Sequence, residues 1–149
     1  MNYTVPRIAY MSCNILIYLC DNNYNNINIK YELLNDGIIK LISLILTVHN
    51  SINQIIETTC QIIGIFSICS YEIQSDIKDN YYFIIIQSFK ENNTYNILQN
   101  LLITDSFSPY THNSISSTVT DTLQLLDQVF AMYTLTSFSE VPRCGQILP

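Results

Sequence analysis

Five cysteines and two histidines are the side chains of this sequence best suited to nucleophilic catalysis or metal binding. No two cysteines form the C-x-x-C pair that is typical of zinc sites. His49 or His112 could in principle pair with a cysteine, but no catalytic signature surrounds any of the thiols. The carboxylates are scattered, without a close pair that could divide acid and base roles. We therefore expect neither an enzyme nor a bound metal or cofactor.

The cysteines stand at positions 13, 20, 60, 69 and 144, an odd number and too few for a disulfide scaffold. Buried thiols in a reducing compartment are one interpretation, and a thiol that pairs across two chains is the other. Cys20 borders an asparagine-rich loop and Cys144 lies in the C-terminal tail, so these two are the expected accessible thiols. We predict a homodimer with Cys20 or Cys144 nearest to its interface.

The amino-acid composition excludes several classes of fold and of binding partner. The 149 residues are enough for one domain with a real core. Six basic against twelve acidic residues give a net charge of -6, which leaves no basic stripe for nucleic acid or for an anionic membrane surface. Three glycines and four prolines are few for the many tight turns of a sandwich or barrel. An all-α fold is favoured, and the abundant Ile, Tyr and Thr leave an all-β alternative.

No segment is expected to span a membrane. The longest strongly apolar runs, 38–48 and 62–69, are shorter than the roughly 20 residues that a spanning helix needs. The run 8–20 follows Arg7 as in a signal peptide, but polar residues 21–23 replace the small residues of a cleavage site. We expect a protein that is not secreted.

Apolar residues at helical spacing predict the elements that position these side chains. Helices are expected over residues 7–20, 29–48, 54–73, 81–89, 94–103 and 118–138. In the first helix, Ile8, Met11, Ile15 and Tyr18 or Leu19 recur along one face. Polar stretches at 21–28 and 74–80 read as loops.

The middle of the chain reads as the core. Between residues 62 and 69 the predicted helix 54–73 is apolar on every side, which is typical of a buried helix that others wrap. The fold predicted is one all-α domain: a compact bundle of about seven helices around a buried central helix, with an apolar groove at its surface. Residues 104–117 form a linker, and Thr118 and Asp121 look like a capping box that opens an extra amphipathic helix over 118–138. Residues 139–149 form a tail.

The central stretch Thr58-Thr-Cys-Gln-Ile-Ile-Gly-Ile-Phe-Ser-Ile68 resembles the first homology motif of the Bcl family of apoptosis regulators, Asn-Trp-Gly-Arg-Ile-Val-Ala-Leu-Phe-Ser-Phe. Its apolar half matches, whereas residues 58–61 replace the four signature residues. Segments 7–24, 32–38 and 79–99 resemble the family's first, second, and sixth and seventh helices in the same order, although the second helix's Gly-Asp pair is reversed as Asp36-Gly37.

The resemblance covers residues 7–103, the expected Bcl-like core. Residues 104–149 depart from the family, which usually ends in a membrane anchor, and this departure fits a divergent viral homologue. The resemblance implies a protein of the host-cell cytoplasm, peripheral to mitochondria through its partners, that inhibits apoptosis. It would hold the death-motif helix of a Bim-, Bak- or Bax-type protein in an apolar groove.

The groove that the resemblance implies has two walls and a floor. Gln61 stands at the position of the family's Arg and offers only a neutral hydrogen bond, so few or weak ligands are expected. The other expected lining residues are Leu34, Ile38 and Ile42 on one wall, Ile52, Ile55 and Ile56 on the other, and Ile62 and Phe66 on the floor. Two alternatives stay open: the same fold blocking innate immune signalling, and an all-α self-assembling structural protein.

Overall fold

The computed structural model describes residues 2–21, 27–68, 75–104 and 112–139. Every element in these ranges is an α-helix, which confirms the all-α prediction. The seven helices are α1 (Pro6–Asp21), α2 (Ile27–Asn35), α3 (Ile38–Val48), α4 (Asn53–Ser67), α5 (Ser75–Glu91), α6 (Thr94–Ile103) and α7 (His112–Ser139).

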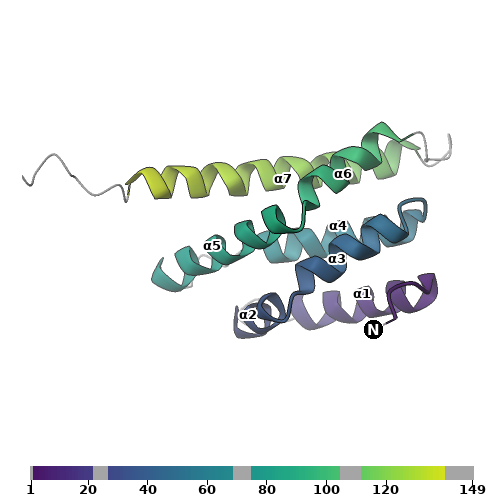
Figure 1. Ribbon diagram of the computed structural model, residues 1–149, viewed down its shortest axis with the longest axis horizontal. Coiled ribbons are helices and arrows are strands. Elements are labelled where there is room, and N and C mark those ends of the chain that lie inside the picture. The colour runs from purple at the N-terminus through teal and green to yellow at the C-terminus, as the bar shows by residue number, and fades with distance from the viewer. Residues whose placement is uncertain (1, 22–26, 69–74, 105–111, 140–149) are drawn as a thin grey trace, which may run out of the picture.

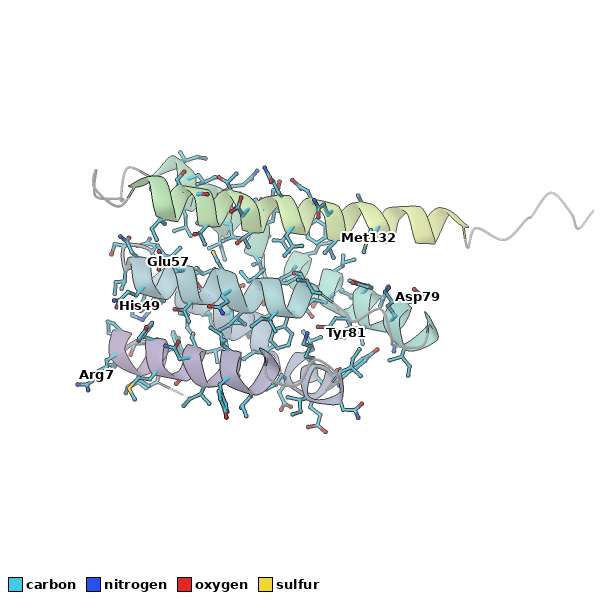
Figure 2. All side chains as sticks on the ribbon, turned by 180° about the vertical axis from the view of Figure 1, so that it is seen from behind. Arg7, His49, Glu57, Asp79, Tyr81 and Met132 are labelled. Atoms are coloured by element: carbon cyan, nitrogen blue, oxygen red, sulfur yellow. The ribbon has the colours of Figure 1, made fainter. Side chains whose placement is uncertain are left out.

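Helix α4 lies in the middle of the bundle, between α1 on one side and α7 on the other (Figures 1 and 2). It also contacts α3 and α5. A helix that several neighbours cover needs apolar residues on several faces. The apolar stretch predicted within residues 54–73 provides them. The residues that α4 buries are Ile55, Ile56, Thr58, Thr59, Cys60, Ile62, Ile63, Phe66 and Ser67.

One helix was expected over residues 29–48, but the structure has two helices there, α2 and α3. Gly37 adopts a left-handed backbone conformation with φ 81°, which ends α2 and lets the chain change direction. Its N–H donates to the carbonyl of Leu34 at 3.1 Å, which satisfies a carbonyl of the last turn of α2. The apolar spacing continues across this turn, so periodicity alone could not reveal the break.

Two other boundaries differ from the prediction. Helix α5 begins at Ser75, inside the polar stretch 74–80, and α7 begins at His112, inside the expected linker 104–117. Thr118 therefore lies within α7 and is no cap: its carbonyl accepts a hydrogen bond from Thr122 Oγ1 at 2.8 Å. Ile115 and Val119, one turn apart, are both buried, so tertiary packing extends the helix through serine-rich sequence.

The central helix is shorter than predicted. It ends at Ser67, and Ile68 is already extended with φ -107° and ψ 124°. The remainder of the predicted segment, residues 69–73, lies outside the described residues, as does the tail from residue 140.

Candidate functional site

The expected groove residues lie on three adjacent elements, α2, α3 and α4, together with the turn before α4. Gln61 is exposed and Ile52 is half-buried. The other seven are no more than 7% exposed and belong to the core: Leu34, Ile38, Ile42, Ile55, Ile56, Ile62 and Phe66. The structure thus brings these residues together, but as interior packing and not as the lining of an open groove. Ile55 and Ile56, expected in one wall of the groove, are buried and do not lie at the surface.

The C-terminal end of α4 is held by two side chains from other helices. Lys30 of α2 donates from Nζ to the carbonyls of Ile65 at 2.7 Å and Ile68 at 3.1 Å. The Tyr81 hydroxyl of α5 donates to the carbonyl of Phe66 at 2.6 Å. The last carbonyls of a helix have no partner within it and carry partial negative charge, so a cation and a buried hydroxyl suit this position. These contacts cannot be recognised from the sequence, because 35 residues separate Lys30 from Ile65.

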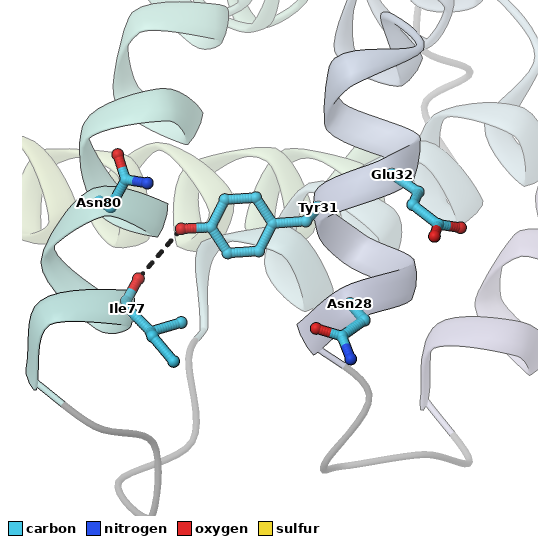
Figure 3. Close-up of a pocket in the computed structure, with 5 residues that line it drawn as sticks. All are labelled: Asn28, Tyr31, Glu32, Ile77 and Asn80. Carbon is cyan, nitrogen blue, oxygen red and sulfur yellow. Dashed lines mark hydrogen bonds between the residues drawn. The ribbon is translucent and has the colours of Figure 1, made fainter.

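A shallow cleft of about 570 Å³ separates α2 from α5 (Figure 3). Tyr31 crosses it from α2, and its hydroxyl donates to the carbonyl of Ile77 at 3.1 Å. The ring of Tyr31 also meets Tyr81 edge-on, with centroids 5.5 Å apart. Asn28, Glu32 and Asn80 complete the lining, so the cleft offers hydrogen bonds and one carboxylate but no nucleophile paired with a base. The role of the cleft is structural, because it contains the hydrogen bond from Tyr31 that ties α2 to α5.

The three described cysteines are buried, free thiols. Burial raises the pKa of Cys13 and Cys60 to about 11. At Cys60 a hydrogen bond with Thr122 opposes this rise. Burial also raises the pKa of Cys20, although the nearby charge of Lys30 acts in the opposite direction. Protonated thiols are poor nucleophiles, and Cys20 is not the accessible thiol that was expected. Cys144 lies outside the described residues.

His49 has a structural contact. Its side chain is buried, and Nε2 lies 2.7 Å from the carbonyl oxygen of Tyr3, so it joins the end of α3 to the segment before α1. Within the described ranges, no three His, Cys, Asp or Glu side chains are grouped so that they could hold a metal ion. In the same ranges, no helix has both the length and the hydrophobicity to cross a membrane.

The face of α1 that the apolar spacing singled out points to solvent. Ile8, Met11, Ile15 and Tyr18 are 42%, 55%, 59% and 69% exposed. The face that packs against α4 instead carries smaller side chains: Ala9, Cys13, Leu16 and Cys20. We call the four exposed residues the outer stripe of α1. The sequence showed the stripe, but not the direction in which it points.

Comparison of the chain with protein-family models, with curated proteins and with solved structures finds no match.

Proposed function

We propose that this chain is a non-catalytic protein that holds an amphipathic helix of another protein. The helix would be the death motif of a pro-apoptotic Bim-, Bak- or Bax-type protein, and the result would be inhibition of host-cell apoptosis. One observation supports this above others: residues 58–67 of the motif-like stretch lie in the central helix α4, and α1 and α3, from the segments that resemble the family's earlier helices, pack against it. A central helix that is covered by several others suits helix-in-groove recognition, in which it would form the floor.

A ligand helix that enters beside the C-terminal end of α4 would have to displace α2, which is bound there through Lys30. Helix α2 is lightly packed: the one side chain that it buries is Leu34, and its helix contacts are mainly with α3 and α5. Its polar ties include the Lys30 bonds to the end of α4 and the Tyr31 bond to α5. Gly37, in its left-handed conformation, supplies the hinge. If only a fraction of molecules has α2 released, the apparent affinity falls by that fraction.

This access route gives a direct test with synthetic death-motif peptides and the full chain. The variant Lys30→Met/Tyr31→Phe weakens the ties that hold α2 in place. If these ties stabilise the closed state by about 1.4 kcal/mol, the variant should bind a peptide about tenfold more tightly than the wild type. Lys40→Met is the matched control, because it removes the same charge from an exposed position on α3. It should leave the affinity unchanged. Titration that finds no peptide bound by the wild type or by the released variant would end the proposal.

Gln61 offers a second, independent test. It is exposed on α4 and stands where the Bcl family has its ligand-binding Arg. Gln61→Arg should add a charge-assisted hydrogen bond to the Asp of a death-motif peptide and raise its affinity up to about tenfold. A peptide whose Asp is replaced by Ala should show no such gain. An equal gain for both peptides would contradict the proposed orientation of the ligand.

The buried state of the seven groove residues favours a second candidate. A protein of this fold whose groove stays closed could act through its outer surface and block innate immune signalling. The loss of the motif's polar half at residues 58–61 supports the same candidate. Two assays in cells that express the chain should separate the two functions. Protection from staurosporine-type death tests the first candidate, and inhibition of an inflammatory reporter tests the second. Protection without reporter inhibition would remove the second candidate.

A further inference from the structure

We propose that the outer stripe of α1 is a homodimer interface, in which α1 packs antiparallel against α1 of a second copy of this chain. Helix α1 has two apolar faces. The face with Ala9 and Cys13 is covered by α4, whereas the outer stripe is exposed. Four large side chains that are about half exposed make an apolar patch on the order of a few hundred Å², a size at which patches often bind a partner. This inference is independent of the function proposed above.

The spacing of the outer stripe identifies the kind of partner. Ile8, Met11, Ile15 and Tyr18 follow one another at intervals of three, four and three residues, which is the a and d spacing of a coiled-coil seam. Such a seam accepts one helix that lies nearly parallel to its own axis. The 16 residues of α1 give a contact about 24 Å long. A contact of this length is at the lower end of interface sizes, so dimerisation in the micromolar range is expected.

The stripe is complementary to itself in the antiparallel direction. With two α1 helices crossing at the level of residue 13, Ile8 faces Tyr18 of the partner subunit and Met11 faces Ile15 of the partner subunit. Each layer then joins one a position with one d position, and the two-fold axis repeats both layers. Apolar contacts fill all four layers, so the contact buries no charge.

Charge also favours a second copy in this orientation. The two charged residues of α1 are Arg7 in its first turn and Asp21 at its end, so antiparallel packing brings unlike ends together whereas parallel packing brings like ends together. Antiparallel helix dipoles add to this preference. Each chain carries a net charge of -6, but eleven of its twelve acidic residues follow α1 in the sequence. Helix α1 itself carries no net charge, because Arg7 and Asp21 balance, so packing two copies of it together adds little repulsion.

Sedimentation equilibrium of the full chain, from about 1 to about 100 µM and with reductant present, tests the proposal. We expect a monomer–dimer equilibrium. Ile15→Lys should weaken it about tenfold or more, because a charge would enter the centre of the contact. Ile103→Lys is the matched control: it changes an apolar residue that is 77% exposed on α6, and the dimer should persist. Circular dichroism should show both variants as helical as the wild type.

A charge-swap pair tests the orientation. Met11→Lys and Ile15→Glu should each weaken the dimer, and the double variant should restore it, because antiparallel packing places the new Lys opposite the new Glu of the partner subunit. Parallel packing would place like charges together, so failure to restore would overturn the proposed orientation. A wild type that stays monomeric at about 100 µM, or that forms assemblies larger than a closed dimer, would overturn the interface itself. A monomer that binds a foreign amphipathic peptide through Ile15 would overturn it as well.

Discussion

At the scale of single residues, the Tyr81 hydroxyl is a buried donor with a clear partner. Its oxygen lies 2.6 Å from the Phe66 carbonyl, and the residue is 0% exposed. Tyr81→Phe removes the donor and leaves that carbonyl unsatisfied, so the free energy of unfolding should fall by about 1–3 kcal/mol. Urea denaturation measures this change. Tyr10→Phe, at a half-buried position on α1, should change the free energy of unfolding by less than about 0.5 kcal/mol. Equal effects of the two variants would contradict the role of the bond.

The Cys60 thiol gives the fold a dependence on alkaline pH. Burial raises its pKa from about 9 to about 11, so the unfolded chain releases this proton at lower pH than the folded chain does. Its contribution to the free energy of unfolding is therefore complete below about pH 9 and is lost as the pH rises towards about 11. Cys13 acts in the same direction. Cys60→Ala should make the decline of stability above pH 9 less steep, as measured by urea denaturation across this range. An unchanged slope would show that other groups cause the decline.

At the scale of elements, two glycines should respond to alanine with opposite signs. Gly37 has a φ of 81° in the turn between α2 and α3, so Gly37→Ala should lower the free energy of unfolding by about 1 kcal/mol. Its added Cβ meets no atom within 4 Å, so the cost is backbone strain alone. Gly64 lies inside α4, where the added Cβ would be 3.9 Å from Leu125 Cδ2, an ordinary contact.

Gly64→Ala should therefore raise the free energy of unfolding by about 0.5–1 kcal/mol, because alanine loses less backbone entropy in a helix than glycine does. Thermal denaturation of both variants, followed by circular dichroism, provides the comparison. If both variants change the melting temperature in the same direction, either the turn at Gly37 or the helical environment of Gly64 is assigned wrongly.

At the scale of the whole molecule, α4 joins the helices into one cooperative unit. Ile56 is 0% exposed, and its helix contacts α1, α3, α5 and α7. Ile56→Arg places an unpaired charge among these contacts and should abolish the folded state, with loss of most helical circular dichroism. Gln61→Arg introduces the same residue at an exposed position of the same helix and should leave the melting temperature nearly unchanged. An Ile56→Arg protein that stays helical and melts cooperatively would contradict the central position of α4.

The class of fold and the positions of several helices were predictable from the sequence alone. Helix α6 spans the predicted residues 94–103, and the polar break before it is a turn in which Asn93 adopts a left-handed conformation with φ 52°. The buried character of α4 was also evident from its apolar residues. These features are local: helical spacing, the residues that favour turns and the scarcity of glycine and proline act within a few neighbours along the chain.

Which apolar faces are covered depends on tertiary packing, and the sequence did not predict it. In α1 the larger side chains of the outer stripe face solvent, because the small side chains of Ala9 and Cys13 let α1 approach α4 closely. The expected groove lining became core for a related reason: α1, α3, α5 and α7 all pack against α4. A spacing pattern shows that a face is apolar, whereas burial depends on the shape of neighbours distant in the sequence. That difference separates the fold class, which the sequence predicted, from the burial of each apolar face, which it did not.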